Sequence, residues 1–216
     1  MGGSLENSQC AVEDTPHSTQ NGTDHIAVNS STNKIYVSDV VGNDVTVIDG
    51  SSNTTTTIPV AAFPYAIAIN ENTNKIYVGN GSGDVITVID GATNTTSEIP
   101  VGPQPALLAV NPVTNKVFVL SVVFQGTLVV IDGASGSIEQ QIPIGTQLNT
   151  VSVNSVTNTI YVVDNATTDL TIIDGRTYAV TFAPVGSAPF GATVNPITNK
   201  VYVSNSNDGT VTVLSF

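Results

Sequence analysis

The chain has 216 residues and is strongly acidic, because five Lys and Arg stand against 17 Asp and Glu for a formal net charge of −12. Five basic residues cannot form the clustered positive surface that phosphate contacts need, so a nucleic-acid partner is excluded. A single cysteine excludes an internal disulfide and a multi-thiolate zinc site, and no apolar stretch is long enough to span a bilayer.

Residues 1–24 form an N-terminal segment that precedes the repeated part of the chain. Its opening, MGGSLENSQ, has neither the apolar core nor the basic flank of a signal peptide. The short apolar run from Cys10 to Val12 is its best candidate for a strand. We therefore expect this segment to contribute one strand to the domain that follows.

From His25 onward the chain consists of five copies of one unit of roughly forty residues. The copies span residues 25–65, 66–106, 107–149, 150–190 and 191–216. Each opens with an apolar run that ends in asparagine, and these asparagines are spaced by 41, 41, 43 and 41 residues. They are Asn29, Asn70, Asn111, Asn154 and Asn195. A period of this length is typical of repeat architectures.

Each copy is predicted to form four short strands. In the first copy they read IAVN, KIYV, VTVID and a Thr-rich stretch over 54–60 that ends in IPV. β-Branched and aromatic residues fill these runs, and Asn, Gly, Asp, Ser and Pro fill the gaps between them. Four-stranded units that repeat at this length are propeller blades. The expected fold is all-β, a single five-bladed β-propeller of four-stranded antiparallel blades.

The TNK[IV]YV core, followed by VTVIDG and IPVG, resembles the YVTN family of β-propeller repeats over residues from about 25 to the C-terminus. The resemblance implies a protein of the cell surface or the extracellular space of a prokaryote, in a family whose rings are often seven-bladed. Related repeats also occur in lyases, lactonases and redox enzymes. Five copies leave two possibilities, a five-bladed ring or a piece of a larger protein. We favour one closed domain in which residues 1–24 supply the missing outer strand of the fifth blade.

The repeated polar and aromatic positions are interpreted as architecture. A lysine opens the second strand and an aspartate closes the third, so an opposite-charge pair such as Lys34 with Asp49 is expected at each exposed turn. The Thr-Asn and Asp-Gly pairs are turn chemistry. An aromatic residue recurs in the second strand and is expected to pack between blades. These aromatic residues are Tyr36, Tyr77, Phe118, Tyr161 and Tyr202.

Positions at which the five copies differ are the best candidates for functional residues. The loops that lead into each first strand and those that follow each second strand should share one face around the centre of the ring, which we call the mouth face. On it, Asp24, His25, Asp39 and Asp164 form a candidate metal set for Ca²⁺, Mn²⁺ or Zn²⁺. His25 is also the candidate catalytic base of a small metal-dependent hydrolase or lyase.

The other candidate on the mouth face is a binding surface. Phe124, in an apolar loop, together with Tyr65 and Phe190 offers apolar contact to a ligand. No nucleophile and base stand at a spacing typical of catalysis. We therefore prefer a non-catalytic interaction or adhesion scaffold over the enzyme. Its expected partner is a protein, a glycan or a small molecule, and the chain itself is expected to be a monomer.

Overall fold

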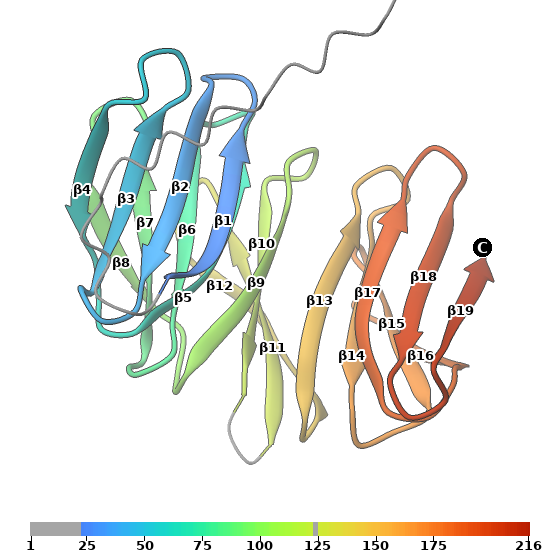
Figure 1. Ribbon diagram of the computed structural model, residues 1–216. Coiled ribbons are helices and arrows are strands. Elements are labelled where there is room, and N and C mark those ends of the chain that lie inside the picture. Colours follow the sequence, from blue (N-terminus) through green and yellow to red (C-terminus); the bar gives the residue numbers. More distant parts are fainter. Residues whose placement is uncertain (1–22, 123–124) are drawn as a thin grey trace, which may run out of the picture.

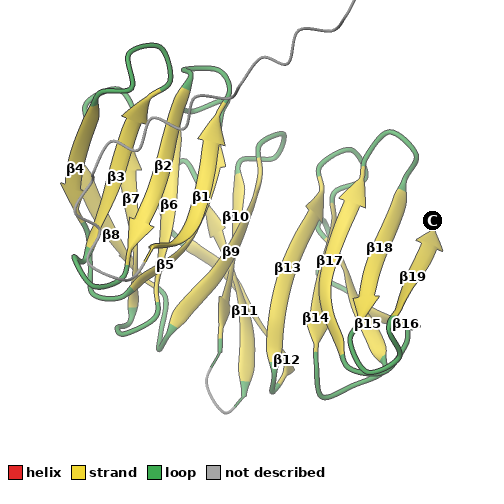
Figure 2. Ribbon diagram, viewed as in Figure 1, coloured by secondary structure: helices red, strands yellow, loops and turns green. Residues whose placement is uncertain are grey.

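The computed structural model describes residues 23–122 and 125–216. These residues form strands, turns and loops without a helix, as Figure 2 shows. In particular, the described residues contain no helix with the length and apolarity of a transmembrane span. The closing strand predicted within residues 1–24 and the predicted binding residue Phe124 lie outside the described residues, except for Thr23 and Asp24 at the start of the first strand.

The strands of each copy form one antiparallel sheet, or blade, in which neighbours along the chain are also neighbours in the sheet. Blade one contains β1 (Thr23–Asn29), β2 (Lys34–Asp39), β3 (Asp44–Asp49) and β4 (Thr55–Pro59). Blade two contains β5 (Pro64–Asn70), β6 (Lys75–Asn80), β7 (Val85–Asp90) and β8 (Thr96–Pro100). Blade three contains β9 (Pro105–Asn111), β10 (Lys116–Ser121), β11 (Gly126–Asp132) and β12 (Ile138–Gly145).

Blade four contains β13 (Leu148–Asn154), β14 (Thr159–Asp164), β15 (Asp169–Asp174) and β16 (Val180–Pro184). Blade five contains β17 (Pro189–Asn195), β18 (Lys200–Asn205) and β19 (Thr210–Ser215). The predicted all-β class and the predicted four-stranded antiparallel blades are thus confirmed for the first four copies. The fifth copy has three strands within the described residues.

The blades stand side by side in chain order (Figure 1). The first strand of each blade lies against the first strand of the next, from β1 to β5, β9, β13 and β17. This is the arrangement of blades in a propeller. Among the described residues, no substantial contact links blade one to blade five, so they show a series of blades and not a closed ring.

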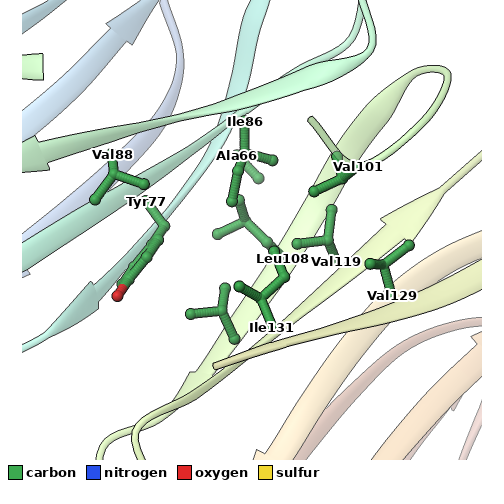
Figure 3. Close-up of a cluster of buried hydrophobic side chains, with 10 residues drawn as sticks. Ala66, Tyr77, Ile86, Val88, Val101, Leu108, Val119, Val129 and Ile131 are labelled. Carbon is green, nitrogen blue, oxygen red and sulfur yellow. The ribbon is translucent and has the colours of Figure 1, made fainter. Parts of the chain in front are cut away.

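The hydrophobic core is divided into four clusters, one between each pair of consecutive blades. Figure 3 shows the cluster between blades two and three, where Tyr77 and Ile86 from one blade meet Leu108 and Val119 from the other. Tyr36, Tyr77, Phe118 and Tyr161 are each buried in the cluster shared with the next blade. The prediction that the aromatic position packs between blades is therefore confirmed for blades one to four.

The turns have the predicted chemistry. The asparagine before each second strand has a positive φ between 51° and 58°, a conformation that asparagine tolerates better than most residues. The aspartate that ends the third strand in blades one to four, such as Asp90, accepts hydrogen bonds from the backbone N–H groups two and three residues further on, those of Ala92 at 2.9 Å and Thr93 at 3.1 Å. These bonds hold the pKa of the Asp90 carboxyl below its usual value, as they do for Asp49 and Asp174.

The asparagine that ends each first strand also joins neighbouring blades. Its side-chain Nδ2 donates to the Oδ1 of the positive-φ asparagine in the next blade, at 2.8–2.9 Å. We call these four bonds the asparagine ladder. Its pairs are Asn29–Asn74, Asn70–Asn115, Asn111–Asn158 and Asn154–Asn199. All four donor asparagines are fully buried, so the ladder holds the blades together at the turn opposite the mouth face.

The predicted lysine–aspartate pair forms in blade three, between Lys116 and Asp132, but the prediction is wrong for Lys34 and Lys75. Lys34 Nζ donates to the Gly91 carbonyl at 3.0 Å, and Lys75 Nζ to the Gly133 carbonyl at 3.3 Å, both in the next blade. Within the described ranges, Lys116 alone forms ion pairs, with Asp132 at 2.8 Å and with Glu139. The lysine lies opposite the aspartate in register, as predicted, but its long side chain reaches across the blade boundary to a carbonyl.

Candidate functional site

The mouth face is shaped by a register irregularity that recurs in every blade. In blade two, Pro64 pairs with Asn80 and the next paired residue is Ile67, opposite Val78. Such a bulge leaves extra residues on the first strand and re-aims a side chain. Residues placed in this way by the bulges of blades two to five are Tyr65, Ala106, Asn149 and Phe190. In blade one the bulge falls at Asp24 and His25.

In blades two to five, a backbone hydrogen bond ties the loop before the first strand to the residue that follows the second strand of the same blade. The Gly81 N–H donates to the Phe63 carbonyl at 2.8 Å, and the Ser206 N–H to the Ala188 carbonyl at 2.9 Å. Phe63 has a φ of 62°, and its own N–H donates to Asn43 Oδ1 of the preceding blade at 2.8 Å. The predicted sharing of one face by these two sets of loops is confirmed by these bonds.

A hollow of about 380 Å³ opens on this face, and we call it the central hollow. Its lining comes from four consecutive blades and is mainly apolar and aromatic. The lining residues are Phe63, Tyr65, Gly81, Ala106, Leu107, Val122, Leu148, Asn149 and Phe190. All four bulge residues of blades two to five are among them. The hollow thus exists because equivalent bulges in successive blades aim their side chains at one place.

Two of the predicted binding residues, Tyr65 and Phe190, line the central hollow together. Phe190 is 61% exposed, which is unusual for a phenylalanine and leaves its ring free for contact. Phe63 and Leu148 also line the hollow and were not among the predicted residues. The signal for Phe63 was its place directly before Pro64 in the loop that leads into β5, a segment that differs between copies.

His25 lies at the edge of the central hollow. Its ring centroid is 5.5 Å from that of Tyr65, with the two planes tilted by 49°. Ser38 links β1 to β5. Its Oγ accepts a hydrogen bond from the His25 N–H of β1 at 3.1 Å and donates one to the Tyr65 carbonyl of β5 at 2.9 Å. The predicted catalytic candidate is therefore next to the hollow, with an aromatic neighbour.

The carboxylates predicted to share a metal with His25 are engaged elsewhere. Asp39 Oδ1 accepts from the Val41 and Gly42 N–H groups at 3.0 and 2.9 Å. Asp164 accepts from three backbone N–H groups, those of Thr146, Gln147 and Ala166, at 2.9–3.2 Å. Both side chains are buried caps of turns.

Across residues 25–122 and 125–216, no three His, Cys, Asp or Glu side chains come together in a group fit to hold a metal ion. His25, Asp39 and Asp164 are therefore not assembled into one ligand set. The side chain of the fourth predicted ligand, Asp24, lies outside the description.

The fold and the central hollow place the chain among all-β, propeller-like proteins. No family model matches the sequence, and no curated protein matches it either. Among solved structures, the chain is similar to the hydrazine synthase of Kuenenia stuttgartiensis, with 18% identity and a TM-score of 0.53 over 90% of this chain and 76% of the other. It is also similar to a chain of a nidogen/laminin complex, with 14% identity and a TM-score of 0.67 over 90% and 80%. At these identities the likeness concerns the fold alone.

Proposed function

We propose that this protein is a non-catalytic interaction scaffold that binds its ligand in the central hollow. The observation that carries the proposal is the convergence of aromatic and aliphatic side chains from four blades on one hollow of about 380 Å³. The resemblance to YVTN repeats supports a place at the cell surface or outside a prokaryotic cell.

The chemistry of the lining favours a ligand that presents an apolar or aromatic group. Phe63 and Phe190 are 49% and 61% exposed, and covering them would remove a large apolar area from water. Asn149 adds an amide that can direct a hydrogen-bonding ligand. A protein segment with one apolar side chain at its centre fits this lining, since interface anchors of this kind insert into such pockets. The nidogen/laminin neighbour is itself part of a protein–protein complex, which is consistent with this use of the fold.

Selection from a displayed peptide library, with an immobilised glycan panel in parallel, tests the proposal. The wild type should enrich peptides that carry an aromatic or aliphatic anchor, and Phe190→Ser should lose most of their binding. Phe182→Ser is the matched control, because Phe182 is 66% exposed and does not line the hollow. Equal binding by Phe190→Ser and wild type, or selection of glycans alone, would reject a peptide site in the hollow.

A metal-dependent hydrolase or lyase is the second candidate, and the contact of His25 with Tyr65 at the edge of the hollow is the observation in its favour. Thermal unfolding with Ca²⁺, Mn²⁺ or Zn²⁺ tests it on the wild type and on His25→Ala. Stabilisation of the wild type alone, together with hydrolysis of an activated ester or lactone, would favour the enzyme. If no metal raises the melting temperature of the wild type, the metal-dependent enzyme is rejected and the interaction scaffold remains the proposed function.

A further inference from the structure

We propose that the free face of blade five binds blade one of a second copy of this chain, so that copies associate head to tail. The two faces correspond to the faces with which consecutive blades pack against each other within the chain. We call them the tail face, on blade five, and the head face, on blade one.

The tail face exposes positions that are buried in every other blade. The apolar residue four positions before the end of the third strand is 0% exposed in blades one to four, as Val45, Ile86, Leu128 and Leu170, where the next blade covers it. Its equivalent in blade five, Val211, is 61% exposed. Two residues further on, Val213 is 49% exposed, whereas Val47 and Val88 are 5% and 7% exposed. The tail face is therefore built like a covered face, and none of the described residues covers it.

The head face shows the complementary pattern. In blades two and three the residue three positions before the ladder asparagine packs against the preceding blade, and Ile67 and Leu108 are each 8% exposed. The equivalent residue of blade one, Ile26, is 67% exposed, and Val28 on the same strand is 54% exposed. Terminal repeats of stable arrays normally carry a polar outer face. Among the described residues, the head and tail faces instead expose Ile26, Val28, Val211 and Val213.

At the same two ends of the series, one donor and one acceptor of the ladder type have no partner blade among the described residues. Asn195 stands where Asn29, Asn70, Asn111 and Asn154 stand in their blades. Its Oδ1 accepts the turn N–H groups of Ile197 and Thr198, but within the described residues its Nδ2 has no blade to donate to. At the other end, Asn33 occupies the place of the acceptors, and no preceding described blade supplies a donor to its Oδ1. A blade one docked on blade five would join Asn195 to Asn33 and repeat the bond formed four times within the chain.

The occupant is a second copy because the tail face fits a blade of this repeat, and the free head face belongs to blade one. In the part of the chain that the structure describes, these faces stand at opposite ends of the series and make no substantial contact (Figure 1). Contact between different faces of two copies is heterologous, so it leads to a closed ring of copies or to a filament. The net charge of −12 on each copy opposes association, and added salt should strengthen it by screening.

Sedimentation velocity on the full chain tests this proposal with two variants that disable one face each. Val211→Asp blocks the tail face and Ile26→Asp blocks the head face; both positions are exposed, so each variant should fold. The wild type should form species larger than one copy as concentration and salt rise, and each variant alone should stay a single copy. An equimolar mixture of the two variants should form dimers and nothing larger, because one intact head and one intact tail remain. Val156→Asp is the control, since Val156 is 73% exposed on a turn of blade four and should associate like the wild type.

Three outcomes would overturn the proposal. The first is a wild type that remains a single copy at every concentration and salt, as expected if its own blades close the ring or if residues 1–22 cover a face. The second is a variant mixture without dimers, and the third is undiminished association of either single variant. Circular dichroism checks that each variant is folded, and Val213→Asp replaces Val211→Asp if the latter fails to fold.

Discussion

The asparagine ladder can be tested by exchanging one atom. Asn70→Asp keeps the size of the side chain and the Oδ1 that accepts the Asn72 N–H at 3.1 Å. It replaces the Nδ2 donor by a carboxylate oxygen, which would face the Asn115 Oδ1 at 2.8 Å in a fully buried position. A lost hydrogen bond and two facing acceptors should lower the free energy of unfolding by about 2–4 kcal/mol at pH 7.

The matched control is Asn195→Asp, which has the same turn bonds without a ladder bond to a following blade. Asn195→Asp should lower the free energy of unfolding by less than about 1 kcal/mol, because it changes a half-exposed turn and breaks no ladder bond. Both variants are compared in a Val211→Asp background, which keeps copies apart, by urea unfolding followed by circular dichroism and tyrosine fluorescence. Because the introduced carboxyl can donate to Asn115 Oδ1 once it is protonated, part of the lost stability should return as the pH is lowered. Equal losses for the two variants would show that the ladder bond contributes nothing to stability.

Three further predictions concern the repeated positions. Lys75→Ala should cost up to about 1 kcal/mol in urea unfolding, since its ammonium donates to a carbonyl of the next blade, while Lys200→Ala in blade five should cost nothing; equal effects would contradict the cross-blade bond. Tyr36→Phe should leave stability unchanged or raise it by about 1 kcal/mol, because the buried Tyr36 hydroxyl has no hydrogen-bond partner among the described residues and Phe118 fills the equivalent place in blade three; a clear loss of stability would contradict this. Because backbone N–H groups hold the folded-state pKa of Asp90 below its ordinary 3.8, its contribution is present above that value and is lost as the pH falls below it. Melting temperatures should therefore fall below about pH 4, and less steeply in Asp90→Asn; an identical slope would show that this turn does not contribute.

The candidate site was predictable in part. Tyr65 and Phe190 could be found because the copies differ at that position, so a variable residue at a fixed place in a repeat pointed to the mouth face. The metal set could not be judged in the same way. Asp39 and Asp164 occupy places that suit a ligand, but the number of backbone N–H groups around each carboxylate depends on the folded loops.

The strands, the turns and the composition of each blade follow from the amino-acid sequence. These features are local: alternating apolar residues make a strand, and an asparagine tolerant of positive φ or an Asp-Gly pair makes a turn within a few residues. Repetition then implied that the blades stand side by side. None of these steps requires contacts between distant parts of the chain.

The contacts between groups on different blades depend on the tertiary structure. The hydrogen-bonded Asn70 and Asn115 are 45 residues apart, and Lys75 donates to a carbonyl 58 residues away. A local sequence pattern therefore cannot predict either hydrogen bond. The central hollow also depends on long-range placement, because its walls come from four blades whose bulges must point to one centre. The exposure of Ile26 and Val211 is decided in the same way: their sequence is that of a covered strand, and only the position of the neighbouring blades leaves them open.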